Sequence, residues 1–455
     1  MLPAYLYTPI YHHAMLLVVI ACALVYWAGQ HQLKSLTLVN QAAMIVVGIV
    51  VLLFMGLRPI SGVFLDMVDY ARAYDRVQQG AEGSYRDSVF NMLMHLCSPI
   101  LPVEGFFLVC ALLYIAPLAI AFRRIHRSWA FPVFLASLTA MSFWAYGVNG
   151  IRNGMATSVL ILAFAFYDRT PVMLSLMATA CGLHGSVMLP AVAFLLVRYM
   201  RRTEYWLGFW IACVAVSLGA GNVGEMVLGR YNPFAWDERA GGYILGPESS
   251  GFRADFLAYS ILPVVATLLL AAPTRLGRTR VFHRLLAGRL FEWKWNRTPL
   301  AAPAIAGKTL AFAATRVRRT EGVLASPLQQ NRDLDAAPNS SLNQLGRRPK
   351  GTMHPRSGWE SLPWVRLLRQ DPFYARLVNT YLFANALWVL LIHASFSNRF
   401  AYLSWFMMPW VLAYPFVPGR FVDRPRLPWL VAVLCAQYAF TYFMVVVVYP
   451  LRGLG

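Results

Sequence analysis

Residues 106–122 read FFLVCALLYIAPLAIAF, a run of seventeen positions without a charged side chain, and RRIHR follows directly at residues 123–127. An α-helix needs about 20 mostly apolar residues to cross the hydrocarbon core of a bilayer. A helix that is apolar on every face is buried, either in lipid or inside a large protein. The stretch therefore predicts a membrane-spanning helix that ends at a basic connector.

The same pattern recurs along all 455 residues, of which 58% are hydrophobic, whereas soluble domains contain about 45–50% apolar residues. We therefore predict an all-α, polytopic transmembrane helix bundle of about twelve helices. The expected helices lie at about 11–29, 39–57, 104–122, 129–147, 151–167, 171–184, 186–199, 204–220, 253–272, 376–395, 399–417 and 429–449. The sixth and seventh are short and could form an interrupted pair that meets at His184-Gly185.

The basic connectors predict the orientation, because Lys and Arg concentrate in short cytoplasmic loops. Four, two and two expected helices separate these connectors, so all of them fall on one side of the membrane. They lie at residues 123–127, 198–202, 273–374 and 419–426. If that side is the cytoplasm of a bacterium, a multi-pass protein of the inner membrane has periplasmic loops at 58–103 and 221–252. Helices one to nine then occupy 1–272, a cytoplasmic insert 273–375, and helices ten to twelve 376–455.

The net charge of +20 is concentrated in the expected insert, where residues 273–374 hold 18 Lys or Arg and 6 Asp or Glu. A basic loop beside membrane helices indicates topology and contact with anionic lipids. We expect no nucleic-acid partner, since no nucleic-acid-binding module is recognisable. Low hydrophobicity predicts a largely disordered insert. The six cysteines lack metal-ligand spacing, so no cysteine-based metal site is expected. No Gly-rich phosphate loop is present either, and we expect no cofactor.

Ionisable side chains gather on the expected outer face, although such groups are costly near a membrane and usually serve a site or a partner. Every cation in this set is an arginine, and guanidinium binds phosphate through two parallel hydrogen bonds while it keeps its charge. The set comprises Asp66, Asp69, Tyr70, Arg86, Asp87, Arg152, His184, Asp237, Glu238, Arg239, Arg253, Asp255, Asn398 and Arg399.

Ordinary alternatives accompany several members of this set. Arg253 and Asp255 could pair only with each other at a helix start, and Asp69 could be a solvated loop carboxylate. Arg58, beside Pro59, is interpreted as a helix-end arginine that reaches outward to the membrane surface. The stretch Ser88–Leu101, SVFNMLMHLCSPIL, is apolar but too short to cross, so we expect it to lie on the surface or dip into the membrane.

Five short motifs occur in a fixed order, and together they resemble the EpsG family of Wzy-like exopolysaccharide polymerases. They are Asp69-Tyr70 with Tyr74, GIRNGMA at 150–156, LHGS at 183–186, FRADFLAYS at 252–260 and NRFAYLSW at 398–405. The resemblance covers about residues 60–415. The long basic insert departs from it, because a short loop would be expected there.

The resemblance implies the substrate and the reaction. Wzy-type polymerases use repeat units carried on undecaprenyl diphosphate at the periplasmic face, and they transfer the growing chain onto the next lipid-linked unit. The expected partners are this lipid-linked oligosaccharide, membrane lipids, and a chain-length regulator and a flippase of the same pathway. Neither a nucleotide sugar nor a metal is implied.

Roles for individual residues follow as hypotheses. We expect Arg152, Arg253 and Arg399 to stabilise the diphosphate leaving group as its negative charge develops. A base must take the proton of the acceptor hydroxyl. His184 ranks ahead of Asp69 and Asp255 because histidine side chains titrate near neutral pH. Further substrate contacts are expected from Tyr70, Arg86, Asn149, Arg239 and Asn398.

Three rival functions remain open at this point. A flippase or transporter would need charges along the inner halves of its helices, which here look almost purely apolar. A metal-dependent glycosyltransferase with a polyprenyl-phosphate sugar donor would use a carboxylate pair such as Asp66 and Asp69. An O-antigen ligase-type enzyme would use the same donor with a different acceptor.

Overall fold

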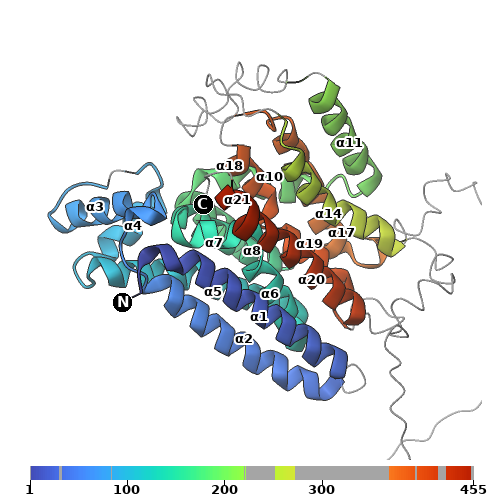
Figure 1. Ribbon diagram of the computed structural model, residues 1–455. Coiled ribbons are helices and arrows are strands. Elements are labelled where there is room, and N and C mark those ends of the chain that lie inside the picture. The colour runs from blue at the N-terminus through green and yellow to red at the C-terminus, as the bar shows by residue number, and fades with distance from the viewer. Residues whose placement is uncertain are drawn as a thin grey trace, which may run out of the picture. The chain divides into compact units, whose positions relative to one another are not determined.

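The computed structural model describes residues 2–29, 33–83, 85–219, 221, 252–271, 368–394, 397–418 and 427–451. All regular secondary structure in these ranges is helical (Figure 1). Nearly all of the expected insert at 273–375 lies outside the described residues, as does Arg239. The side chains of Asn398 and Arg399 also lie outside the described part, although their backbone belongs to a helix.

Four described segments are long and apolar enough to cross a membrane: Ala4–Ala28, Ser35–Gly56, Val103–Leu138 and Leu427–Val448. They contain the helices α1 (Tyr7–Ala28), α2 (Leu33–Gly56), α5 (Val103–His126), α6 (Ala130–Leu138) and α20 (Leu427–Tyr442). The shorter helices include α8 (Ile151–Ala165), α9 (Thr170–Leu183), α10 (Met188–Leu196), α11 (Thr203–Gly219), α14 (Ala254–Ala271) and α17 (Pro372–Val389). The chain is thus a helical, multi-pass membrane protein, whereas the number twelve and the sides of the loops stay predictions.

Two of the predicted helices are each divided into two. The segment 129–147 forms α6 and α7 (Met141–Val148), which are separated where Ala140 adopts an extended conformation. Likewise, 399–417 forms α18 (Ser397–Trp405) and α19 (Met408–Ala413). Pro409 lies in the first turn of α19, where its missing N–H costs nothing. Hydropathy alone does not reveal such breaks, because the residues on both sides are apolar.

The predicted outer loop at 58–103 contains two helices, α3 (Met67–Gln78) and α4 (Ser88–Cys97). In α3, Met67, Tyr70 and Tyr74 point inward and are buried. The charged residues between them occupy the other side, a pattern typical of an amphipathic helix. The predicted segment between the two spans therefore contains two short helices, and its place on the periplasmic side stays a prediction.

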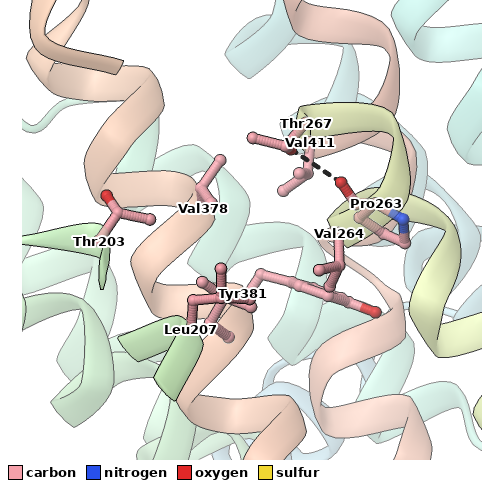
Figure 2. A pocket seen from close by; sticks show the side chains of 9 residues that line it. Thr203, Leu207, Pro263, Val264, Thr267, Val378, Tyr381 and Val411 are labelled. Atoms are coloured by element: carbon pink, nitrogen blue, oxygen red, sulfur yellow. Dashed lines mark hydrogen bonds between the residues drawn. The ribbon is translucent and has the colours of Figure 1, made fainter. Parts of the chain in front are cut away.

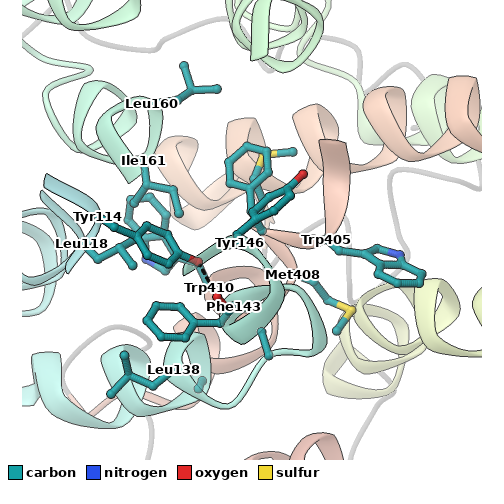
Figure 3. Close-up of a cluster of buried hydrophobic side chains, with 14 of the residues drawn as sticks. Tyr114, Leu118, Leu138, Phe143, Tyr146, Leu160, Ile161, Trp405, Met408 and Trp410 are labelled. Atoms are coloured by element: carbon teal, nitrogen blue, oxygen red, sulfur yellow. Dashed lines mark hydrogen bonds between the residues drawn. The ribbon is translucent and has the colours of Figure 1, made fainter. Parts of the chain in front are cut away.

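In the centre of the bundle, α5 packs against α8 and α8 packs against α9, while α20 packs against α1. Figure 1 shows α2 beside α5 along their length. A cluster of buried aromatic side chains joins α5, α7, α18 and α19 (Figure 3). In it, the Tyr114 hydroxyl donates to the carbonyl oxygen of Phe143 at 3.1 Å, and the two rings stack. This core fixes the region from which α8 begins.

A small apolar pocket lies between α11, α14, α17 and α19 (Figure 2). Leu207, Val264 and Leu382 contribute to its lining. Two of its polar side chains are engaged within the protein, since the Tyr381 hydroxyl donates to the carbonyl oxygen of Ser260 and the Thr267 hydroxyl to that of Pro263. The lining is therefore mainly apolar.

Candidate functional site

The carboxylate of Asp87 connects two residues that the sequence singles out, Arg152 and His184. Its Oδ2 atom forms an ion pair with Nη1 of Arg152. Its Oδ1 atom lies 3.6 Å from Nδ1 of His184 and accepts the backbone N–H of Gly185 at 3.3 Å. All three side chains are between 12% and 18% exposed, so a substrate can still reach them. One carboxylate therefore organises an arginine and a histidine in a single cluster.

Helix ends deliver the three side chains. Arg152 is the second residue of α8, and His184 lies between α9 and the 3-10 helix Gly185–Val187, as the predicted interruption requires. Asp87 occupies the N-cap of α4 but makes no side-chain cap bond there. An N-cap aspartate ordinarily accepts an N–H of its own helix. The Asp87 side chain is therefore directed to other helices.

The close approach of α4 to α9 depends on Gly182. A Cβ atom at residue 182 would lie 2.4 Å from Cγ2 of Val89, far inside van der Waals contact. Only a residue without a side chain fits there. Since Val89 and Gly182 lie within two residues of Asp87 and His184, this contact helps to bring the carboxylate to the imidazole.

Aromatic rings surround the Arg152 guanidinium. Its Nε donates to the Tyr70 hydroxyl at 3.3 Å. Its central carbon lies 4.4 Å from the ring centroid of Tyr85 and 5.9 Å from that of Phe90. Cations are attracted to aromatic faces at such distances. Tyr70 and Arg152, two residues predicted separately for the site, are thus in contact, and the rings of Tyr85 and Phe90 lie on other sides of the guanidinium.

The charge state of the cluster follows from its contacts. Burial alone would raise the pKa of Asp87, but the neighbouring His184 side chain, followed by the charge of Arg152, outweighs it. The pKa of Asp87 therefore lies below its ordinary value. Burial raises the pKa of Tyr85 to about 12 and also raises that of Tyr70, despite the opposing effect of Arg152. Near neutral pH the carboxylate is thus ionised and the two phenols are neutral.

Two nitrogen atoms of the cluster remain open toward a substrate. Within the part of the chain that the structure describes, neither Nη2 of Arg152 nor Nε2 of His184 has a hydrogen-bond partner. The former can donate to an oxyanion. A tautomer with its proton on Nδ1, toward Asp87, would leave on Nε2 the lone pair that can accept a proton. The arrangement matches a base held in place by a carboxylate, beside a fixed cation.

A second ion pair stands at the start of α14. Arg253 donates to both carboxylate oxygens of Asp255, at 3.0 and 2.8 Å, and its guanidinium lies 3.6 Å from the ring centroid of Phe256. The alternative that these residues pair with each other is therefore observed. Tyr402, from α18, contributes to the electrostatic environment of Arg253 and packs edge-to-face against Tyr146 at 5.1 Å.

Among the other predicted site residues, the structure describes the side chains of Asp69, Arg86 and Asn149. Asp69 is exposed on α3 and pairs with Arg72 at 3.5 Å, as expected for a solvated carboxylate. Arg86 is exposed. Asn149 accepts the backbone N–H of Asp66 at 3.0 Å, which ties the start of α3 to the residues before α8. Arg239 and the side chains of Asn398 and Arg399 lie outside the described residues.

The outward-reaching role assigned to Arg58 was wrong. Its side chain is buried, donates to the carbonyl oxygens of Met55 and Val148, and lies near the rings of Phe64 and Phe107. Those carbonyls belong to the last turns of α2 and α7, where a positive charge complements the helix dipole. Arg58 therefore braces the backbone directly before Asn149.

Comparison with known proteins gives one match. A family model described as the EpsG family matches residues 41–275. The matched region includes Asp87, Arg152, His184 and the Arg253–Asp255 pair. No curated protein and no solved structure matches the chain. Among the described residues, no group of three or more His, Cys, Asp or Glu side chains is placed to hold a metal ion.

Proposed function

The chain belongs to the EpsG family of Wzy-like polysaccharide polymerases, and on that premise we propose that it polymerises oligosaccharide repeat units carried on undecaprenyl diphosphate. The reaction takes place at the periplasmic face of the bacterial inner membrane and yields exopolysaccharide. The observation that carries this proposal is the contact of one carboxylate, Asp87, with both Arg152 and His184. It combines a proton acceptor and a cation, the two groups that a glycosyl transfer from diphosphate needs.

The proposed step is a single displacement. A hydroxyl of the acceptor sugar attacks the anomeric carbon of the growing chain, and its proton passes to Nε2 of His184. The bond from that carbon to the diphosphate oxygen breaks, and undecaprenyl diphosphate leaves with the electron pair. Nη2 of Arg152 stabilises the negative charge that develops on the leaving oxygen. One direct displacement inverts the anomeric configuration.

Asp87 has a supporting role in this step. Its Oδ1 holds the Nδ1 side of the imidazole and stabilises the imidazolium that forms after proton transfer. Its Oδ2 fixes the guanidinium of Arg152. Because Asp69 is exposed and paired with Arg72, the geometry favours His184 as the base. Arg253 and Arg399 are proposed to contact the diphosphate of the second lipid-linked unit.

The test is a knock-out strain complemented with variants. Loss of the protein should abolish polymer and leave single repeat units on the lipid carrier, and His184→Gln should behave alike while remaining in the membrane. Empty carriers would place the protein upstream and overturn the proposal. Two further outcomes would support rivals: activity lost on chelation indicates a metal-dependent glycosyltransferase, and repeat units trapped on the cytoplasmic side indicate a flippase.

A further inference from the structure

The segment between α2 and α5 carries an exposed apolar face. On α4 and the turn after it, Met92, Leu96 and Ile100 are 55%, 61% and 80% exposed. Their spacing of four residues places them along one side. The ten residues of α4, SVFNMLMHLC, include no Asp, Glu, Lys or Arg. His95 is exposed on the same helix, and a group of exposed apolar side chains of this kind marks an interaction site.

The neighbouring helix α3 exposes the opposite chemistry. Its outward side consists of Asp69, Arg72, Asp75 and Arg76, followed by Gln79, while Tyr70 and Tyr74 are buried beneath. The two helices contact each other. One short segment therefore presents a charged surface on one helix and an apolar surface on the next, which indicates two different surroundings.

The position of the segment identifies the apolar surroundings. It begins directly after the candidate span Ser35–Gly56 and ends where the candidate span Val103–Leu138 begins. Because α2 packs against α5, both connections leave the same end of the bundle. Figure 1 shows α3 and α4 at that end. The lipid surface is thus adjacent to the segment at both of its ends.

We propose that α4 lies in the boundary between headgroups and acyl chains of the lipid leaflet, with Met92, Leu96 and Ile100 inserted, while α3 faces water. The ten residues of α4 span about 15 Å, which is too short to cross the hydrocarbon core of a bilayer. Helices with one apolar face bind in the plane of the interface. The occupant of the apolar face is therefore the bilayer itself.

This placement adds a consequence that rests on the proposed function. Asp87 is the N-cap of α4, so an interfacial α4 sets the Asp87–Arg152–His184 cluster at headgroup depth. A carrier lipid presents its diphosphate at the same depth. The enzyme would then meet the scissile bond without extracting the carrier from the membrane.

Spin labelling tests the lipid contact without any assay of polymer. Met92→Cys and Leu96→Cys on α4, with Arg72→Cys and Gln79→Cys on α3 as matched controls, are labelled in the full chain. The protein is reconstituted in vesicles of phosphatidylethanolamine and phosphatidylglycerol. Collisions with oxygen, which concentrates in lipid, are compared with collisions with a water-soluble nickel chelate. The wild-type chain gives the background from native cysteines.

For labels at residues 92 and 96, we expect the collision rate with oxygen to exceed the collision rate with the nickel chelate several-fold. For labels at residues 72 and 79, we expect the reverse. Nickel access at 92 and 96 equal to that at 72 and 79 would overturn the proposal. Low access to both reagents would overturn it as well, since a protein surface such as a second copy would then cover the face. Either failure would leave the transfer chemistry of His184 standing, because the measurement does not depend on it.

Discussion

The Oδ1 atom of Asp87 lies 3.6 Å from Nδ1 of His184, although the two residues belong to different helical hairpins. The contact determines that Nδ1 is the ring nitrogen that faces the carboxylate. The other ring nitrogen is consequently the one that a substrate can meet. The first prediction follows from this asymmetry.

Asp87→Asn keeps the size of the side chain but removes its charge. It should lower polymerisation by about 10²–10⁴-fold, the range that a positioned base contributes. Polymer per cell and lipid-linked single units measure the loss, with membrane immunoblots to confirm that the protein is present. Asp75→Asn, on the exposed side of α3, serves as the control and should be neutral. Wild-type polymer from Asp87→Asn would remove the carboxylate from the mechanism.

Arg152→Lys retains a positive charge, yet an ammonium cannot contact Tyr70, Asp87 and a leaving oxygen through three nitrogens at once. We expect polymer to be lost while the protein stays in the membrane. Arg124→Lys is the matched control, because Arg124 binds the carbonyl oxygen of Ala165 at the other end of α8. Polymer of normal length from Arg152→Lys would count against the guanidinium.

Gly182→Ala tests whether the α4–α9 contact positions the cluster. The added methyl would collide with Val89, separate the helices and draw Asp87 away from His184. Polymer should fall and chain lengths should shorten. Val89→Ala in the same chain creates space for the methyl and should restore much of the activity. If the double variant is as impaired as Gly182→Ala, another defect is responsible.

The depressed pKa of Asp87 makes a prediction about acid stability. An unfolded Asp titrates near pH ~3.9, and the folded group titrates lower. The ion pair should therefore stabilise the protein fully above about pH 4 and lose its effect as the pH falls through the folded pKa. Near pH 7, the free energy of unfolding measured by thermal denaturation in detergent should be about 1–3 kcal/mol larger for the wild type than for Asp87→Asn. A difference that persists undiminished at the lowest pH would contradict this origin.

Part of the fold could be predicted because a helix surrounded by lipid needs a recognisable amino-acid composition. A spanning helix must be apolar all round, so α1, α2, α5 and α20 are visible as hydropathy. The break at Ala140 is not, since a backbone turn between apolar residues leaves hydropathy unchanged. The helix α3 was not predicted for the opposite reason: it is amphipathic, and its charged side gives the segment no hydropathy signal of a spanning helix.

In the candidate site, too, some residues could be predicted from the sequence and others could be recognised only in the structure. Arg152, His184 and Tyr70 could be selected because charged and polar residues are conspicuous among apolar ones, and the structure brings them together. Asp87 was counted among the groups on the outer face but was given no role, because the sequence does not show what its side chain contacts. Its missing cap bond, visible only in three dimensions, distinguishes it. Arg58 could not be interpreted without knowing which carbonyls it meets.

Arg152, His184 and Asp87 emerge from the ribosome on separate helices, and none can act until all have been inserted and packed. A nascent chain that has delivered only α4 and α8 holds a carboxylate and a cation that neutralise each other. The imidazole follows one helix later, after α9. The proposed transfer therefore depends on the completed packing of this half of the chain.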